Sequence, residues 1–134
     1  MEPANTPLVM LVDDNEIDLF LAKKFLRVAG ITEKIVTFQT AAEALDYLEK
    51  HAGSITDLPD LILLDIQMPV MNGFQFLERF ATLQNYLSKT PHIIMLSSTV
   101  DPIDEERARL NPLVADMLKK PLNPDELKAT IAKL

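Results

Sequence analysis

The sequence predicts an α/β fold, a doubly wound parallel sheet of five strands with helices on both faces. Short apolar runs alternate along the chain with segments of helical spacing, and several runs are apolar throughout and end in acidic or other polar residues. A strand that is apolar at every position is typical of a parallel sheet buried on both faces. Regular alternation of strand and helix then implies right-handed crossovers and two layers of helices.

The first strand and the first helix lie near the N-terminus. Residues 8–12 are all apolar and the run ends abruptly at Asp13, Asp14 and Asn15, so we expect a buried strand there. The next segment is expected to form a helix that ends at Gly30, because apolar residues recur in it at helical spacing. These apolar residues are Ile17, Phe20, Leu21, Phe25 and Val28.

The middle of the chain repeats this alternation. Residues 35–38 predict a short strand, and Thr40 is placed to cap a helix that continues through Leu48. Residues 61–64 form another fully apolar strand, which ends at Asp65. Residues 73–83 follow as an aromatic-rich segment that predicts a helix.

The last third of the chain predicts two strands and two helices. Residues 92–96 are an apolar strand, residues 103–110 predict a helix, and residues 116–118 leave room for only a short strand. The final helix has the clearest start, because Asn123 can cap it, Pro124 suits its first turn and Glu126 stands where a capping box places an acid.

Length and composition indicate one ordinary domain. In a chain of 134 residues, we place that domain at residues 8–134, after a short polar tail at residues 1–7 and with no output domain. No apolar run approaches the roughly 20 residues needed to cross a bilayer, so membrane insertion is not expected. The chain has no Cys, which fits a reducing compartment, and we place it in the cytoplasm. A net charge of −7 argues against direct nucleic-acid binding, which depends on Lys and Arg.

Polar residues follow the predicted strands at the edge where an open parallel sheet binds its ligands. Asp13 and Asp14 follow the first strand, Asp65 the third, Ser97 the fourth and Lys120 the fifth. Such sheets bind ligands in the crevice beyond the carboxyl ends of the strands, so the five side chains are expected to converge there. Taken singly, each has a structural explanation, such as a solvated turn or an exposed cation; the convergence favours a functional site.

Three carboxylates in one crevice require a compensating cation, because each would otherwise resist ionisation. All-oxygen ligation suits Mg²⁺, which retains waters and commonly takes a phosphate ligand. A carboxylate beside such a cation can attack an activated phosphorus, so Asp65 is expected to become an aspartyl phosphate. The Lys120 ammonium and the Ser97 hydroxyl would share the phosphoryl charge.

Five short motifs resemble those of response-regulator receiver domains, of the kind found in single-domain chemotaxis regulators. They are LVDDN at residues 11–15, LLDIQMP at 63–69, NG at 72–73, MLS at 95–97 and KP at 120–121, in the family's order and spacing. The resemblance runs over essentially the whole chain. It implies a flavodoxin-like sheet of strand order 2-1-3-4-5.

The resemblance also implies a metal site and a phosphorylation site. Asp65 matches the phosphorylated aspartate, and Asp13 and Asp14 match the acid pair that positions Mg²⁺. Gln67 matches the residue whose backbone carbonyl completes the metal site. The phosphoryl group would come from a phosphohistidine on a sensor histidine kinase or a histidine phosphotransfer protein.

Two further residues match the family's signalling machinery, and one departs from it. Ser97 matches the switch hydroxyl and Lys120 the phosphate-contacting lysine, so phosphorylation is expected to change the conformation seen by a downstream protein partner or relay. Met117 stands where the family usually has an aromatic residue that swings inward with that hydroxyl, so the switch is expected to take an altered form that uses the flexible Met side chain.

Other functions remain as alternatives. A phosphorylation-independent receiver-like interaction module is the main one, although such loss usually removes an acid or the lysine and neither is missing. A Mg²⁺-dependent phosphohydrolase would usually carry a second acid where this chain has Gln67. A flavodoxin-like nucleotide binder needs a phosphate loop where Asp13 and Asp14 stand.

Overall fold

The computed structural model describes residues 6–99 and 101–134, so most of the predicted tail, residues 1–5, lies outside the described residues. The strands are β1 (Val9–Val12), β2 (Ile35–Phe38), β3 (Leu61–Asp65), β4 (His92–Ser97) and β5 (Val114–Lys119). The helices are α1 (Glu16–Val28), α2 (Ala41–Lys50), α3 (Gly73–Leu83), α4 (Pro102–Leu110) and α5 (Pro124–Ala132), with a short 3₁₀ turn, η2 (Gln84–Tyr86). Among the described helices, none has the length and apolar character that crossing a membrane requires.

The five strands form one parallel sheet in the order β2-β1-β3-β4-β5, which confirms the predicted fold class and strand order. The register of the strands positions the candidate site. Val12 pairs with Leu64, so Asp13 and Asp65 each follow at the same level on adjacent strands. The carboxyl ends of β1 and β3 therefore present their acids side by side.

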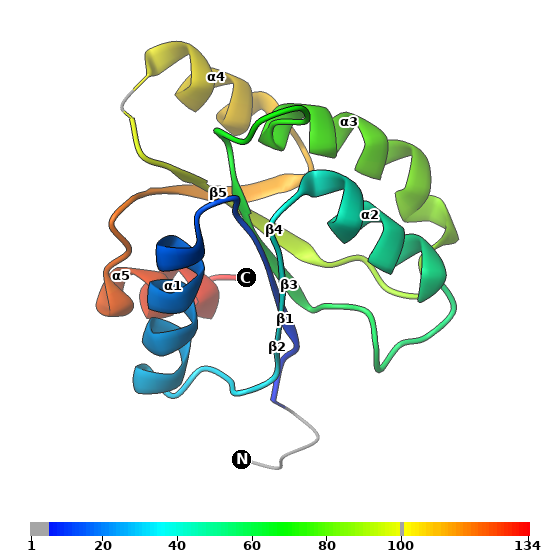
Figure 1. Ribbon diagram of the computed structural model, residues 1–134, viewed down its shortest axis with the longest axis horizontal. Coiled ribbons are helices and arrows are strands. Elements are labelled where there is room, and N and C mark those ends of the chain that lie inside the picture. The colour runs from blue at the N-terminus through cyan, green and yellow to red at the C-terminus, as the bar shows by residue number, and fades with distance from the viewer. Residues whose placement is uncertain (1–5, 100) are drawn as a thin grey trace.

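Helices cover both faces of the sheet, and each face has its own core (Figure 1). The larger core packs α2, α3 and α4 against one face and contains Phe76 and Phe80, both fully buried. The smaller core packs α1 and α5 against the other face, around Leu26 and Leu127. Strands β1, β3 and β4 contribute to both cores, which is why their sequences are apolar at nearly every position.

Polar side chains cap the helices, and two of these caps, Thr40 and Asn123, lie where the sequence predicted them. The Asn15 side chain accepts hydrogen bonds from the backbone of Ile17 and Asp18, and Thr40 caps α2 in the same manner. Asn123 caps α5 through two backbone N–H groups, and α3 has a reciprocal capping box made by Asn72 and Gln75. These caps fix the directions in which α1 and α3 leave the edge of the sheet that carries the acids.

Two features differ from the sequence-based expectation. Strand β5 has six residues rather than the short strand predicted at residues 116–118, because it is an edge strand whose partly exposed residues give no continuous apolar signal. In α1 the spacing of the large apolar residues correctly predicts a helix, but those residues do not all form its buried face. Ile17, Phe20 and Val28 are 66–69% exposed, whereas the core side of α1 is formed by smaller and intervening residues: Leu19, Ala22 and Leu26.

Candidate functional site

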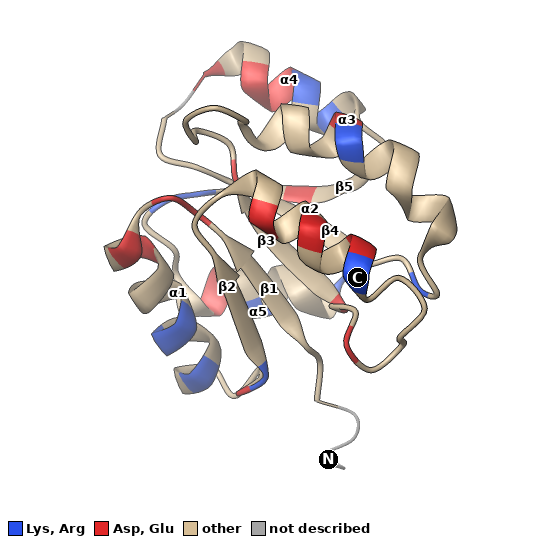
Figure 2. Cartoon of the chain, turned by 45° about the vertical axis from the view of Figure 1, so that its right-hand side comes forward, with Lys and Arg blue, Asp and Glu red and all other residues tan. Residues whose placement is uncertain are grey.

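Three carboxylates lie together at the carboxyl edge of the sheet, as the topology predicted. Asp13, Asp14 and Asp65 each offer one oxygen, and these three oxygens lie within 4.8 Å of one another. Asp13 and Asp65 are buried and Asp14 is exposed, so the cluster opens to solvent on one side. Figure 2 shows acidic residues gathered where β1 ends and α1 begins, the basic residues of α1 further along that helix, and basic residues at the end of β5 beside the acids.

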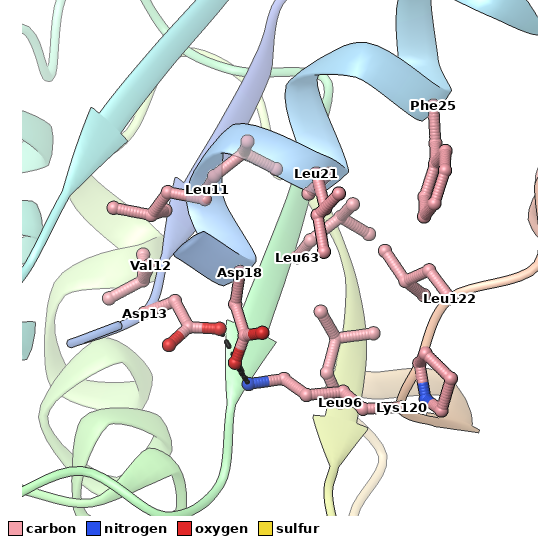
Figure 3. A pocket seen from close by; sticks show the side chains of 13 residues that line it. Leu11, Val12, Asp13, Asp18, Leu21, Phe25, Leu63, Leu96, Lys120 and Leu122 are labelled. Atoms are coloured by element: carbon pink, nitrogen blue, oxygen red, sulfur yellow. Dashed lines mark hydrogen bonds and ion pairs between the residues drawn. The ribbon is translucent and has the colours of Figure 1, made fainter. Parts of the chain in front are cut away.

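Lys120 supplies the positive charge of the crevice. It lies directly after β5, where its backbone N–H donates to the Ser97 carbonyl at 2.7 Å. Its Nζ donates to Asp13 Oδ2 at 2.6 Å and to Asp18 Oδ2 at 2.9 Å, and lies 3.4 Å from Asp65 Oδ1. Figure 3 shows this side chain extending to the carboxylates of Asp13 and Asp18.

Burial and mutual repulsion perturb the ionisation of these groups. Burial, followed by the charge of Asp13, raises the pKa of Asp65 to about 7, although Lys120 and a backbone hydrogen bond from Gln67 act in the opposite direction. Burial alone would lower the pKa of Lys120, but its hydrogen bonds to Asp13 and Asp18 and the charge of Asp65 raise that pKa above its usual value. The crevice thus holds more negative charge than its single lysine compensates.

One buried oxygen of the crevice has unused hydrogen-bonding capacity. Asp65 Oδ1 is shielded from solvent, and no residue that the structure describes donates a hydrogen bond to it. Buried carboxylate oxygens are normally paired, so such an atom indicates a position that a ligand completes. An all-oxygen donor set around a surplus of negative charge fits a hard divalent cation such as Mg²⁺.

Comparison with known proteins identifies the family of this chain. The family model of the response regulator receiver domain matches residues 9–132. The chain belongs to the response regulator receiver family. Receiver domains are signalling domains of two-component systems and are not classed as enzymes in their own right.

Individual relatives agree with this assignment. This receiver domain is 29% identical over 134 residues to the probable methanogenesis regulatory protein FilR2 of Methanothrix harundinacea. The matched region covers 100% of this chain and 84% of that protein. The crystal structure of a two component response regulator from Cytophaga hutchinsonii matches it with a TM-score of 0.84 and 27% identity, covering 93% of each chain. A response regulator receiver protein from Dyadobacter fermentans matches with a TM-score of 0.75 and 38% identity, covering 92% of this chain and 96% of that one.

Some relatives are much longer than this receiver domain. The chain spans between 7% and 13% of the length of three sensor kinases that it also matches. A receiver segment of this kind therefore occurs both in short regulators and inside large kinases.

The remaining residues that the sequence singled out, Ser97, Gln67 and Met117, are engaged in different ways. Ser97 is buried, and its Oγ donates to the Thr99 carbonyl at 2.7 Å while accepting from the Thr99 N–H at 3.2 Å. Gln67 contributes its backbone hydrogen bond to the Asp65 carboxyl. Met117 is half-buried and lines, together with Ser97, a hollow of 400 Å³ between α4 and β5.

Sequence reasoning missed one residue of the crevice, Asp18. Asp18 lies in the first turn of α1, where acidic residues are common because they interact favourably with the helix N-terminus. That local explanation gives no reason to expect a role in the crevice. The contact of Asp18 with Lys120 joins residues 102 positions apart in the sequence, and no local pattern carries that information.

Proposed function

We propose that this receiver domain accepts a phosphoryl group onto Asp65 from a phosphohistidine, in a Mg²⁺-dependent reaction. The observation that carries the proposal is the Asp65 Oδ1 atom, a buried oxygen that accepts no hydrogen bond from any described residue. It lies at the end of β3, in a cluster of three carboxylates and 3.4 Å from the Lys120 ammonium. A nucleophile needs such a free oxygen with compensating positive charge close by.

The transfer exchanges one bond to phosphorus for another. Asp65 Oδ1 attacks the phosphorus in line, forming an O–P bond while the P–N bond of the phosphohistidine breaks. The electron pair of that bond stays on the imidazole nitrogen. The Lys120 ammonium and the Ser97 hydroxyl then share the charge of the phosphoryl oxygens.

The metal would be held by the residues that the geometry brings together. Asp13, Asp14 and Asp65 are the ligands that the geometry supplies, and we assign the backbone carbonyl of Gln67 as a further ligand from the resemblance to the receiver family. When bound, Mg²⁺ supplies positive charge that offsets both the repulsion among the acids and the charge of the transferred group. Asp65 must be ionised to attack, and with a pKa of about 7 without metal only about half of these carboxyls are ionised near neutral pH, so such compensation increases the reactive fraction.

Ser97 couples the phosphoryl group to the rest of the domain in this proposal. Its hydroxyl is bonded within its own loop, to Thr99, and would exchange that partner for a phosphoryl oxygen. The exchange would move the β4–α4 connection next to the hollow lined by Met117, whose flexible side chain can follow such a change. A downstream protein partner or relay would read the altered surface.

The partners follow from this chemistry. The phosphoryl donor would be a sensor histidine kinase or a histidine phosphotransfer protein. With a net charge of −7 the chain is poorly suited to nucleic acid, so we propose a protein output, and the absence of Cys is consistent with a cytoplasmic location. We propose that residues 8–134 act as one receiver unit.

Intact mass spectrometry after incubation with a small acyl phosphate tests the proposal, with and without Mg²⁺. The parent chain is expected to gain one phosphoryl group only with Mg²⁺. Asp65→Asn is expected to gain none, and the matched control Asp46→Asn, which changes an exposed acid of α2, is expected to behave as the parent does.

Fast hydrolysis can hide a phosphoryl adduct, so binding of beryllofluoride with Mg²⁺ is measured on the same proteins. Beryllofluoride binding that requires Asp65 supports the proposal even when no adduct accumulates. Failure of both measurements on the parent chain would overturn it in favour of a phosphorylation-independent interaction module.

A further inference from the structure

Lys120 contacts three carboxylates, and only two of them belong to the cluster that can also hold a metal ion. Its Nζ donates to Asp13 at 2.6 Å and to Asp18 at 2.9 Å, and it lies 3.4 Å from Asp65. Asp13 and Asp65 belong to the three-carboxylate cluster that can hold a metal ion, and Asp18 does not. A divalent cation in the crevice therefore competes with the lysine for two of its three carboxylates but leaves Asp18 available.

The position of Asp18 is fixed by the structure around it. Its backbone N–H donates to the Asn15 side chain at 3.1 Å, within the cap that starts α1. Its side chain is 36% exposed and that of Lys120 is only 12% exposed, and both line a small cavity with the apolar side chains of Leu63 and Leu96 (Figure 3). An ion pair that is partly shielded from water holds its geometry better than a fully exposed pair.

We propose that Asp18 is a positioning residue, which keeps the Lys120 ammonium at the crevice when a metal ion draws on Asp13 and Asp65. This inference rests on the proposed function and deepens it. An ammonium group has three N–H donors. With one of them committed to Asp18, the others remain directed toward the position that the phosphoryl oxygens occupy beside Asp65.

The positioning role and a simple charge effect predict opposite changes in anion affinity when Asp18 is removed. Asp18 is a negative charge near an anion-binding position, so its removal should strengthen anion binding if only long-range electrostatics mattered. If Asp18 acts by holding Lys120, its removal should instead weaken anion binding. The direction of the change therefore distinguishes the two explanations.

The test measures Mg²⁺ affinity and, at saturating Mg²⁺, beryllofluoride affinity for four full-length chains: the parent, Asp18→Asn, Asp18→Glu and Glu16→Gln. Glu16 is the matched control, because it is an exposed acid of the same helical turn. We expect Asp18→Asn to weaken beryllofluoride binding about tenfold, near the lower end of the range for losing one hydrogen bond to a charged group, because Asp18 is partly exposed. We expect its Mg²⁺ affinity to stay within about twofold of the parent, since Asp18 lies outside the metal cluster. Asp18→Glu should recover part of the loss, and Glu16→Gln should show none.

A double-mutant cycle tests whether Asp18 acts through Lys120. In a Lys120→Ala background, Asp18→Asn is expected to cause no further loss of beryllofluoride affinity, because the ammonium that it positions is gone. Urea unfolding of each variant establishes that it is folded under the binding conditions.

Two failures have different meanings. A parent chain that does not bind beryllofluoride overturns the proposed function itself. A parent chain that binds, together with an Asp18→Asn variant that binds equally well or more tightly, overturns only the positioning role of Asp18.

Discussion

Replacing Asp65 by Asn should stabilise the metal-free protein above neutral pH. The Asp65 carboxyl is 4% exposed, lies beside Asp13 and has its pKa raised to about 7 from an ordinary value of 3.8. Between these two pH values the unfolded chain has this carboxyl ionised while the folded protein keeps it protonated. Folding therefore takes up a proton, and the contribution of this group to stability falls as the pH rises through about 7.

The size of the effect follows from the same shift. Each pKa unit corresponds to about 1.4 kcal/mol, so a rise of roughly three units gives an upper limit of about 4 kcal/mol above pH 7. The Asn amide is neutral at every pH and removes this cost. The pKa shift already includes the attraction to Lys120 at 3.4 Å, and solvent screening reduces the effect, so we expect a net stabilisation of about 2–4 kcal/mol at pH 8 and nearly none at pH 4.

Urea unfolding of the parent chain and Asp65→Asn, in EDTA and at a series of pH values, measures this difference. Asp46→Asn serves as the control, because that acid is 63% exposed and forms an ion pair with Lys50 on the surface of α2, where such a pair contributes little. A stability difference that is the same at every pH, or an Asp65→Asn variant no more stable than the parent at pH 8, would refute the reasoning.

Three further outcomes are expected. Gly73→Ala should destabilise the fold by about 1–3 kcal/mol in urea unfolding, because an added Cβ would lie 2.8 Å from the Asp65 carbonyl oxygen, whereas Gly53→Ala, with nothing within 4 Å, should be nearly neutral. Asn123→Ala removes the side chain that caps α5 through two backbone N–H groups and should cost about 1 kcal/mol in the same assay, and an unchanged stability would contradict the capping role. Mg²⁺ at roughly ten times its dissociation constant should raise the unfolding free energy of the parent by about 1.4 kcal/mol, and the same concentration should stabilise Asp13→Asn much less.

The sequence predicted most accurately those strands whose side chains are buried on both faces of the sheet. Strands β1, β3 and β4 pack against helices on both faces and are apolar at almost every position, so composition alone identifies them. The edge strand β5 was predicted too short because its exposed positions interrupt that signal. The buried side of α1 was not apparent because Ile17 and Phe20 are large and apolar yet exposed, whereas Ala22 is small and buried.

The candidate site could be predicted from the sequence as far as the topology of the sheet determines it. Residues that directly follow parallel strands must share one edge of the sheet, and Asp13, Asp65 and Lys120 do so. Asp18 lies on a helix rather than at a strand end, so its place in the crevice depends on how α1 packs against the β5–α5 connection. The partner of the Ser97 hydroxyl likewise depends on the conformation of a loop and follows from no sequence pattern.

The ion pair between Asp13 and Lys120 joins residues 107 positions apart, which matters during synthesis of the protein. During translation Asp13 and Asp65 are synthesised well before Lys120, the lysine that neutralises them. Until the segment after β5 emerges, a partly folded nascent chain would hold the Asp13 and Asp65 carboxylates close together without their counter-charge. Without a cation in the crevice, closure of the sheet on that portion is therefore disfavoured until the segment after β5 has been synthesised, so the crevice and strand β5 should form in one cooperative step.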